Sequence, residues 1–227
     1  MGAPLKGPVG HLPSASDFAD DYGFEEDCGS ALHFATTPEM AKLLIDNGAD
    51  VNELSTCWRA PLHVAVENRD LVMAKALLDY GADINVRGDE YIDPYIFYAT
   101  PLHHALHNDT DDVYLPMAKF LVERGADLSM MDNRDDTPLF IAITYDAYAT
   151  TKMLLEHNAP VNMARPSGET PLHRASSQGK FAIAKLLLVH GALVNTTTIM
   201  GRSPLREALE NNNTALVLLL HQYGALD

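Results

Sequence analysis

Short apolar runs separated by polar, turn-forming stretches extend through most of this chain. Residues 170–175 read Thr-Pro-Leu-His-Arg-Ala, and the apolar run Leu-Leu-Leu follows at 186–188. A Thr side chain can accept a hydrogen bond from an unpaired helix N–H, and Pro suits the first helical position because it has no N–H to leave unpaired. The pattern therefore predicts two short helices, the first beginning near Pro171 and the second packing its leucines against the first.

This pattern recurs along the chain with intervals of 30 to 40 residues. Copies of the first stretch begin at residues 30, 60, 100, 137, 170 and 203. Most copies continue with a second stretch of the type Gly-Ala-Asp-Val-Asn, as in residues 48–52 and 81–85. A paired motif of this period is the sequence signature of ankyrin repeats. Residues 29–227 therefore resemble an ankyrin-repeat protein.

The resemblance implies an all-α fold, a solenoid of stacked helix-turn-helix pairs with β-hairpin-like fingers between repeats. Two short helices cannot bury their apolar faces alone, so neighbouring pairs have to stack. Gly81, Gly125 and Gly191 are expected at helix ends in the left-handed conformation, which Gly adopts at little cost. We place the repeats in a single array at about 29–59, 60–99, 100–136, 137–169, 170–202 and 203–227.

Three segments depart from the repeat pattern. Residues 1–28 form an N-terminal extension, in which Phe18 and Tyr22 are spaced to cover the open end of the first repeat as a short helix; a mobile tail is the alternative. In the first repeat, Thr37-Pro38 follows the first motif so closely that its first helix should be shortened. The finger at 86–99 carries extra residues rich in aromatic side chains, and residues 108–115 form an acidic insertion.

The formal net charge is −15, and the pI is about 4.9. This acidity argues against a nucleic-acid partner and against an anionic membrane surface. It favours a basic partner surface or serves only to keep the protein soluble. We find no apolar stretch long enough to span a membrane. Two cysteines, Cys28 and Cys57, make no disulfide framework, which favours a reducing, cytoplasmic or otherwise intracellular compartment. We expect a monomer.

The resemblance also implies that binding uses the fingers and the ends of the first helices. Large aromatic residues and Arg are enriched among interface hot spots. The aromatic group at 58 and 91–98 is therefore the strongest candidate contact region, although a long finger could instead fold several of these rings back onto its neighbours. The candidate partner-binding residues are Trp58, Arg59, Glu67, Asn68, Tyr91, Tyr95, Phe97, Tyr98, His107, Asn108, Arg134, Tyr145, Arg165, Gln178 and Arg202.

The residues that most suggest chemistry recur with the repeat. The histidines of the first motif (His33, His63, His103 and His173) occupy one repeat position, which predicts that their rings bond neighbouring backbone. His103 and His107 lie one helical turn apart and could share a metal, but spacing fixes no third ligand, so we predict no metal site. His104 replaces a usual Leu and is expected to weaken packing.

A second recurring polar residue is the finger asparagine, at positions 52, 85, 162 and 195. We expect its side chain to bond the backbone of its own turn. The resemblance also leaves open its hydroxylation by an asparaginyl hydroxylase.

We find no H-E-x-x-H, C-x-x-C, G-x-S-x-G or Gly-rich phosphate motif. The sequence therefore favours a non-catalytic protein–protein interaction module without cofactor, which holds a partner protein or peptide in a concave groove. A first alternative is a small-molecule or acid–base site where the finger at 88–98 closes over Glu67, His107, Asn108 and Tyr145. A second alternative is the substrate-recognition part of a larger complex, or a microbial effector.

Overall fold

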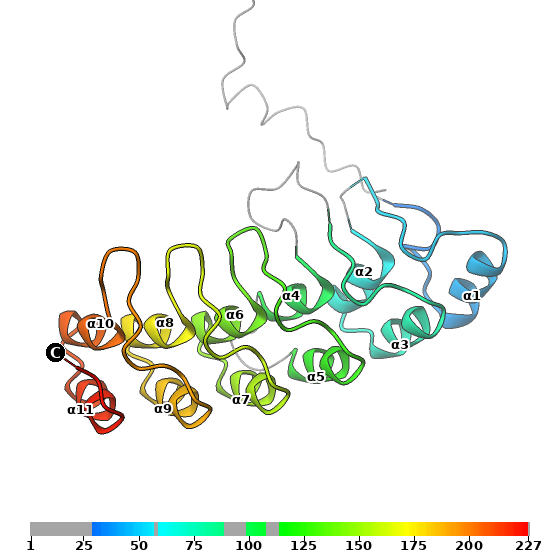
Figure 1. Ribbon diagram of the computed structural model, residues 1–227. Coiled ribbons are helices and arrows are strands. Elements are labelled where there is room, and N and C mark those ends of the chain that lie inside the picture. Colours follow the sequence, from blue (N-terminus) through cyan, green and yellow to red (C-terminus); the bar gives the residue numbers. More distant parts are fainter. Residues whose placement is uncertain (1–28, 57–58, 89–98, 108–113, 227) are drawn as a thin grey trace, which may run out of the picture.

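The described residues of the computed structural model (29–56, 59–88, 99–107 and 114–226) form the predicted all-α solenoid, in which helices lie in two rows (Figure 1). Each inner helix packs against the following outer helix, and successive inner helices pack against one another. The inner row comprises α2 (Pro61–Glu67), α4 (Pro101–Leu106), α6 (Pro138–Thr144), α8 (Pro171–Ser177) and α10 (Pro204–Glu210). The outer row comprises α1 (Pro38–Asp46), α3 (Leu71–Asp79), α5 (Leu115–Glu123), α7 (Tyr148–Glu156), α9 (Phe181–Val189) and α11 (Thr214–Gln222).

The helices begin and end where the sequence predicts. Each described inner helix has Pro at its first turn, and the Thr170 and Ser203 side chains accept hydrogen bonds from the N–H groups of the first turns of α8 and α10. Outer helices are followed by a residue in the left-handed region, which is Gly after all of them except α7, where it is Asn158; φ is 93° at both Gly81 and Gly125. In the first repeat, residues 31–34 form turns, and α1 is the first helix of the described chain.

The loops between each outer helix and the next inner helix, called fingers below, project on the side of the inner row (Figure 1). No strand occurs in the part of the chain that the structure describes. The fingers whose bases are described are instead closed by one backbone hydrogen bond between the N–H of one residue and the carbonyl four residues later. These bonds join Ser55 to Arg59, Asp132 to Asp136, Arg165 to Glu169 and Thr198 to Arg202, at 2.9 to 3.0 Å.

The rings of the motif histidines bond neighbouring backbone, as predicted, and these bonds also link adjacent repeats. The ring of His63 is fully buried; its Nδ1 accepts from the Ala60 N–H, and its Nε2 lies 3.1 Å from the carbonyl oxygen of Ala99 in the next finger. Because Nδ1 is an acceptor, the proton is on Nε2, which donates to that carbonyl. His33, His103 and His173 make the same contact with the carbonyls of Arg59, Met130 and Arg202.

The prediction for the finger asparagines is wrong. Their side-chain oxygens accept hydrogen bonds from the next repeat, as in the 2.8 Å bond from the Asp83 N–H to Asn52. In the turns of Asn52 and Asn85, the backbone is already braced by the Asp two positions earlier, since Asp50 accepts from the Asn52 N–H and Asp83 from the Asn85 N–H, both at 2.9 Å. The side chain of Asn is therefore available to join repeats along the stack. Asn85, Asn162 and Asn195 accept in the same way from Asp127, Leu193 and Leu226.

One buried serine has no partner for its hydroxyl in the described part of the chain. Ser176 on α8 is fully buried, and its hydroxyl has no hydrogen-bond partner within the described residues. The other inner helices carry Val66, Leu106, Ile143 and Leu209 at this position. Burial of an unpaired hydroxyl is unfavourable because its hydrogen bonds to water are lost.

We therefore expect Ser176→Ala to raise the free energy of unfolding by about 1 kcal/mol in urea denaturation. Ser177→Ala is the matched control, because the Ser177 hydroxyl donates to the Arg174 carbonyl at 3.0 Å; it should give no gain. Equal or lower stability of Ser176→Ala would contradict the prediction.

Candidate functional site

The predicted contact residues lie along the fingers and the ends of the inner helices, a surface called the finger edge below. Those in described segments are Arg59, Glu67, Asn68, His107, Arg134, Tyr145, Arg165, Gln178 and Arg202. Trp58, Tyr91, Tyr95, Phe97, Tyr98 and Asn108 lie outside the described residues, as do Cys28, Cys57, Phe18 and Tyr22. The aromatic group thus remains a prediction.

The first charged group joins Arg59, Glu67 and His104. The Arg59 guanidinium donates to one Glu67 oxygen at 2.6 Å, and His104 Nδ1 lies 3.2 Å from the other. Burial acts to raise the pKa of Glu67, but the hydrogen bond from His104 and the charge of Arg59 outweigh it and hold that pKa below its usual value. The His104 ring also meets the His63 ring edge-on, with centroids 4.8 Å apart. His104, expected to weaken packing, therefore has a polar partner in Glu67.

The second group pairs His107 with Asp132. His107 Nε2 lies 3.0 Å from Asp132 Oδ2, and the Asp132 side chain is fully buried. Its other oxygen accepts from the N–H groups of Arg134 and Asp136, at 2.9 and 2.8 Å. Burial acts to raise the pKa of Asp132, yet these donors hold it below its usual value. Both oxygens of the Asp132 carboxylate therefore already have hydrogen-bond donors, two of which belong to the same finger.

These two groups bear on the acid–base alternative. Tyr145 meets His107 edge-on, with centroids 6.5 Å apart, so the structure does bring two of the predicted groups together. The Glu67 carboxylate, by contrast, is occupied by Arg59 and His104. Within the described ranges, no cluster of three His, Cys, Asp or Glu is arranged to hold a metal ion.

The third group replaces the usual histidine contact. Phe140 stands where α2, α4 and α8 carry His, and its ring cannot form a hydrogen bond with the next finger. Arg165 lies over its ring, with the guanidinium carbon 5.1 Å from the centroid, and donates through Nε to Asp136 at 2.8 Å and through Nη1 to Glu169 at 2.9 Å. Its side chain is only 18% exposed. Arg165 therefore links adjacent fingers and offers little surface to a partner.

The fourth group lies at the last described finger. Arg202 Nε is 2.7 Å from Glu207 without hydrogen-bond geometry, and the Arg202 guanidinium also pairs with Glu210, which in turn pairs with Arg206. Because the Arg202 side chain is still 41% exposed, it remains accessible beside its partners. Asn68 and Gln178 are likewise exposed at the ends of α2 and α8.

Ile199 and Met200 are the most exposed apolar side chains in the described part of the finger edge; the resemblance implied Met200 as a finger contact, whereas Ile199 was not singled out from the sequence. Ile199 and Met200, at the tip of the last described finger, are 78% and 81% exposed. With Glu169 and Glu207 they line a cavity of about 190 Å³ between neighbouring fingers. The corresponding tips carry Asn-Arg at 133–134 and Pro-Ser at 166–167. This contrast between repeats is the signal in the sequence that could have identified them.

Charge is unevenly distributed along the array. Residues 1–136 contain 25 acidic and 9 basic residues, whereas residues 137–227 contain 6 acidic and 7 basic residues. The net negative charge of the chain therefore belongs to its N-terminal part, and the aliphatic finger tip lies in the near-neutral part.

A stack of short helix pairs, joined by histidine–carbonyl and asparagine–backbone bonds between repeats, defines a repeat protein of the ankyrin class. Two family models agree: one described as "Ankyrin repeats (3 copies)" matches residues 11–88 and 89–164, and one described as "Ankyrin repeats (many copies)" matches residues 154–208. The chain belongs to the ankyrin-repeat family.

Among curated proteins, the chain is similar to B-cell lymphoma 3 protein of Homo sapiens, with 40% identity, and to its homolog of Mus musculus, with 32% identity, each over 117 residues. Each match covers 50% of this chain and 23% or 24% of the relative, so the chain spans about a quarter of the length of these relatives. A solved structure, the ankyrin repeat domain of Bcl-3, described as a unique member of the IkappaB protein family, has 28% identity and a TM-score of 0.71. That match covers 84% of this chain and 81% of the solved chain.

These comparisons support a protein–protein interaction module, because the ankyrin-repeat fold is an interaction fold. Within the described residues, no helix combines the length and the apolar character that crossing a bilayer requires.

Proposed function

We propose that this chain is a non-catalytic adaptor that binds a partner protein or peptide along its finger edge. The partner places an apolar side chain against Ile199 and Met200 and turns a basic surface towards the acidic N-terminal part of the array. The observation that carries the proposal is the exposure of these two aliphatic side chains beside a cavity between fingers.

The finger tip is a suitable anchor because its position is well defined. The base of the finger is closed by the backbone bond from Thr198 to Arg202, and the Ile199 N–H donates to the Ser167 carbonyl of the preceding finger at 2.9 Å. A side chain held in this way loses little conformational freedom when a partner binds, which favours affinity. Neither side chain contributes to the core, since each is about four-fifths exposed.

Charge supports the second half of the proposal. An excess of acidic residues in the first 136 positions attracts a basic surface and increases its rate of encounter. Two of the arginines predicted to contact the partner, Arg59 and Arg202, form ion pairs within the chain, with Glu67 and Glu207. We infer that they present polar hydrogen-bonding surface rather than net positive charge.

The alternatives of the sequence analysis receive less support. The Glu67 and Asp132 carboxylates are occupied by neighbouring donors, which disfavours an acid–base site. A role as one part of a larger protein or complex, in a reducing intracellular compartment, is compatible with the proposal, and we adopt it as the setting in which the adaptor acts.

The proposal predicts that Ile199→Asp/Met200→Asp weakens partner binding. Partners captured on the wild-type chain should be identified by mass spectrometry and their affinities measured by titration. The double variant should bind at least about tenfold more weakly, as expected for loss of a hot spot. Affinity should also fall with added salt, because the partner is basic.

The control for this experiment is Val72→Asp on α3, which places a carboxylate at another exposed aliphatic position away from the fingers. It should leave the affinity unchanged, and the thermal unfolding of all variants should match that of the wild type. If the finger-tip variant and a variant lacking residues 88–98 both bind as tightly as the wild type, the finger edge is not the binding surface.

A further inference from the structure

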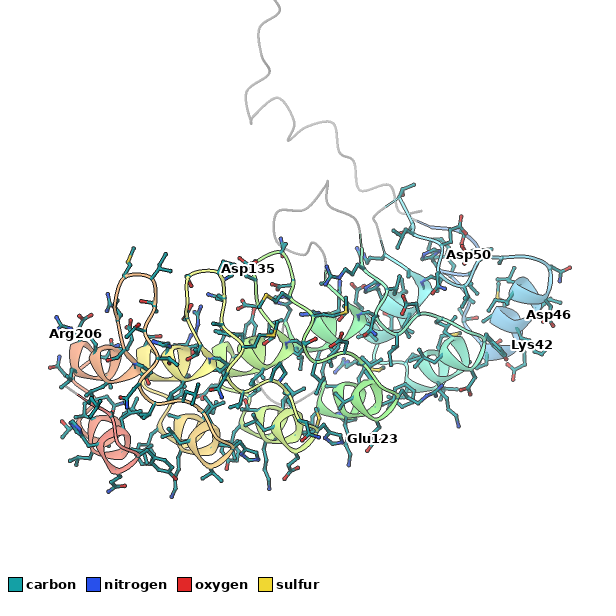
Figure 2. All side chains as sticks on the ribbon, viewed as in Figure 1. Lys42, Asp46, Asp50, Glu123, Asp135 and Arg206 are labelled. Atoms are coloured by element: carbon teal, nitrogen blue, oxygen red, sulfur yellow. The ribbon has the colours of Figure 1, made fainter. Side chains whose placement is uncertain are left out.

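The outer face of the last two repeats carries an aliphatic patch, formed by Val189 on α9, Leu218 on α11 and Leu193 in the loop after α9. Their exposed fractions are 64%, 59% and 58%. This face is opposite the fingers: Figure 2 shows Glu123, which occupies the position of Val189 in its own repeat, on the side of α5 away from them. The patch is therefore distinct from the finger edge.

The other repeats show that folding does not require these aliphatic residues. The positions that correspond to Val189 carry Asp46, Asp79, Glu123 and Glu156 in the four preceding outer helices and Gln222 in α11. All five other outer helices carry Lys where α11 has Leu218: Lys42, Lys75, Lys119, Lys152 and Lys185. The positions are exposed in every described repeat, so an aliphatic side chain adds nothing to the core. Exposed apolar side chains that gather in one place typically mark an interaction site.

Leu193 replaces a residue with a local structural role. In three earlier repeats this position is Asp50, Asp83 or Asp127, whose carboxylate accepts a hydrogen bond from the N–H two residues later at 2.8 to 2.9 Å. Leu193 cannot accept that bond. The substitution is unfavourable for the turn and unhelpful for the core, which indicates a role outside folding.

Val189 and Leu218 share one face of the outer row, and Leu193 follows Val189 by four residues in the loop after α9. Positions five and nine of an outer helix face the same way, because Lys42 Nζ and Asp46 Oδ2, in two residues labelled in Figure 2, are 2.5 Å apart. The pairs Lys119–Glu123 and Lys152–Glu156 form in the same way. Leu218 at position five and Val189 at position nine therefore belong to the same face, and α9 packs against α11. Leu226, 72% exposed, occupies the position of Leu193 in the last repeat, and its N–H bonds to Asn195 in the Leu193 loop.

Lys185 provides a cation beside Val189. Lys185 shares the face of Val189. In α1, α5 and α7 the equivalent Lys pairs with an Asp or Glu four residues later, but four residues after Lys185 stands Val189, which has no carboxylate. Its repeat, residues 170–202, contains four basic residues and no acidic residue. Lys180 pairs with Asp146, whereas the ammonium group of Lys185 makes no ion pair with any residue that the structure describes.

We propose that this patch is a second docking surface, which binds an acidic amphipathic segment of another protein. The aliphatic side chains of that segment cover Val189, Leu193 and Leu218, and a carboxylate beside them pairs with Lys185. The partner chemistry is thus opposite in charge to that of the finger edge, so the array can hold two different proteins at once.

The test is a selection of random peptides displayed on phage against the whole chain, with counter-selection on a variant that restores the residue types of the other repeats: Val189→Glu, Leu193→Asp and Leu218→Lys. This variant is expected to fold, because each new side chain is one that an equivalent position already carries. Recovered peptides should combine paired aliphatic residues with Asp or Glu. Their affinity should fall at least tenfold on Lys185→Glu and stay unchanged on Ile199→Asp/Met200→Asp.

Three results would overturn the proposal: recovery of no peptides that discriminate between the two proteins, recovery of basic peptides, or affinities indifferent to Lys185→Glu. Sedimentation equilibrium tests whether a second copy of this chain occupies the patch instead. If the wild type self-associates and the restored variant does not, the patch is covered by a second copy of this chain rather than by an acidic segment. The proposed function is tested separately, with the variant Ile199→Asp/Met200→Asp. A negative result for this patch therefore does not contradict the proposed function.

Discussion

Leu187→Ala should lower the free energy of unfolding by about 3 kcal/mol, as expected for truncation of a fully buried Leu. Leu187 lies in the middle of α9 with no exposed surface, and it continues a line of buried leucines that includes Leu77, Leu121 and Leu154. Removing its isobutyl group leaves a cavity that short, tightly stacked helices can close only in part. Because each repeat is stable only with its neighbours, the loss should affect the cooperative transition and not α9 alone.

Urea denaturation followed by circular dichroism measures this effect. The matched control is Leu193→Ala, the same substitution at a position that is 58% exposed, which should change the free energy of unfolding by less than about 0.5 kcal/mol. A loss below about 1 kcal/mol for Leu187→Ala would mean that the core around α9 is loosely packed.

Acidification should destabilise the array well before most carboxylates are protonated. Burial lowers the pKa of His63 to about 3, helped by the nearby His104, and burial lowers the pKa of His103 to about 4. In the unfolded chain both groups have a pKa near 6.5. The folded state therefore binds fewer protons than the unfolded state between these values. The stability contributed by the neutral rings is complete above pH 6.5 and is lost as the pH falls towards 4 and 3.

The expected size follows from the free energy of about 1.4 kcal/mol that corresponds to each tenfold change in the proton affinity of a group. For two buried histidines together, the loss between pH 7 and pH 4 should be on the order of 5 kcal/mol, which exceeds half the stability of many domains. Urea denaturation at a series of pH values measures it. Asp132 and Glu67, whose pKa values are held low, should add to the loss at the acidic end.

Two variants separate this effect from general weakening. His63→Gln should be less stable at pH 7 but should show a flatter dependence on pH, because the titrating ring is gone. Ser176→Ala should change the free energy of unfolding at every pH by a similar amount, so that its dependence on pH stays as in the wild type. If the wild type is equally stable at pH 7 and pH 4.5, the buried histidines do not control acid unfolding.

Residues with local roles were predictable. Thr170-Pro171 and Gly81 act within one or two turns of chain, and their effects on helix ends follow from backbone geometry alone. The contact of His63 with neighbouring backbone was also predictable, because a residue repeated once per unit serves the repeat. The candidate site was harder: Arg165 was predicted as a partner contact, but a ring and two carboxylates from neighbouring elements enclose it.

The sequence by itself determined the all-α class, the helix pairs and the need to stack them, because these depend on patterns that lie within one repeat and recur from one repeat to the next. The tertiary structure alone decided which polar groups meet between repeats. Asn52 bonds the N–H of Asp83, 31 residues away, and Arg165 bonds Asp136, 29 residues away. Contacts at that separation depend on how one repeat is placed relative to the next, and the pattern of residues within a repeat does not specify that placement.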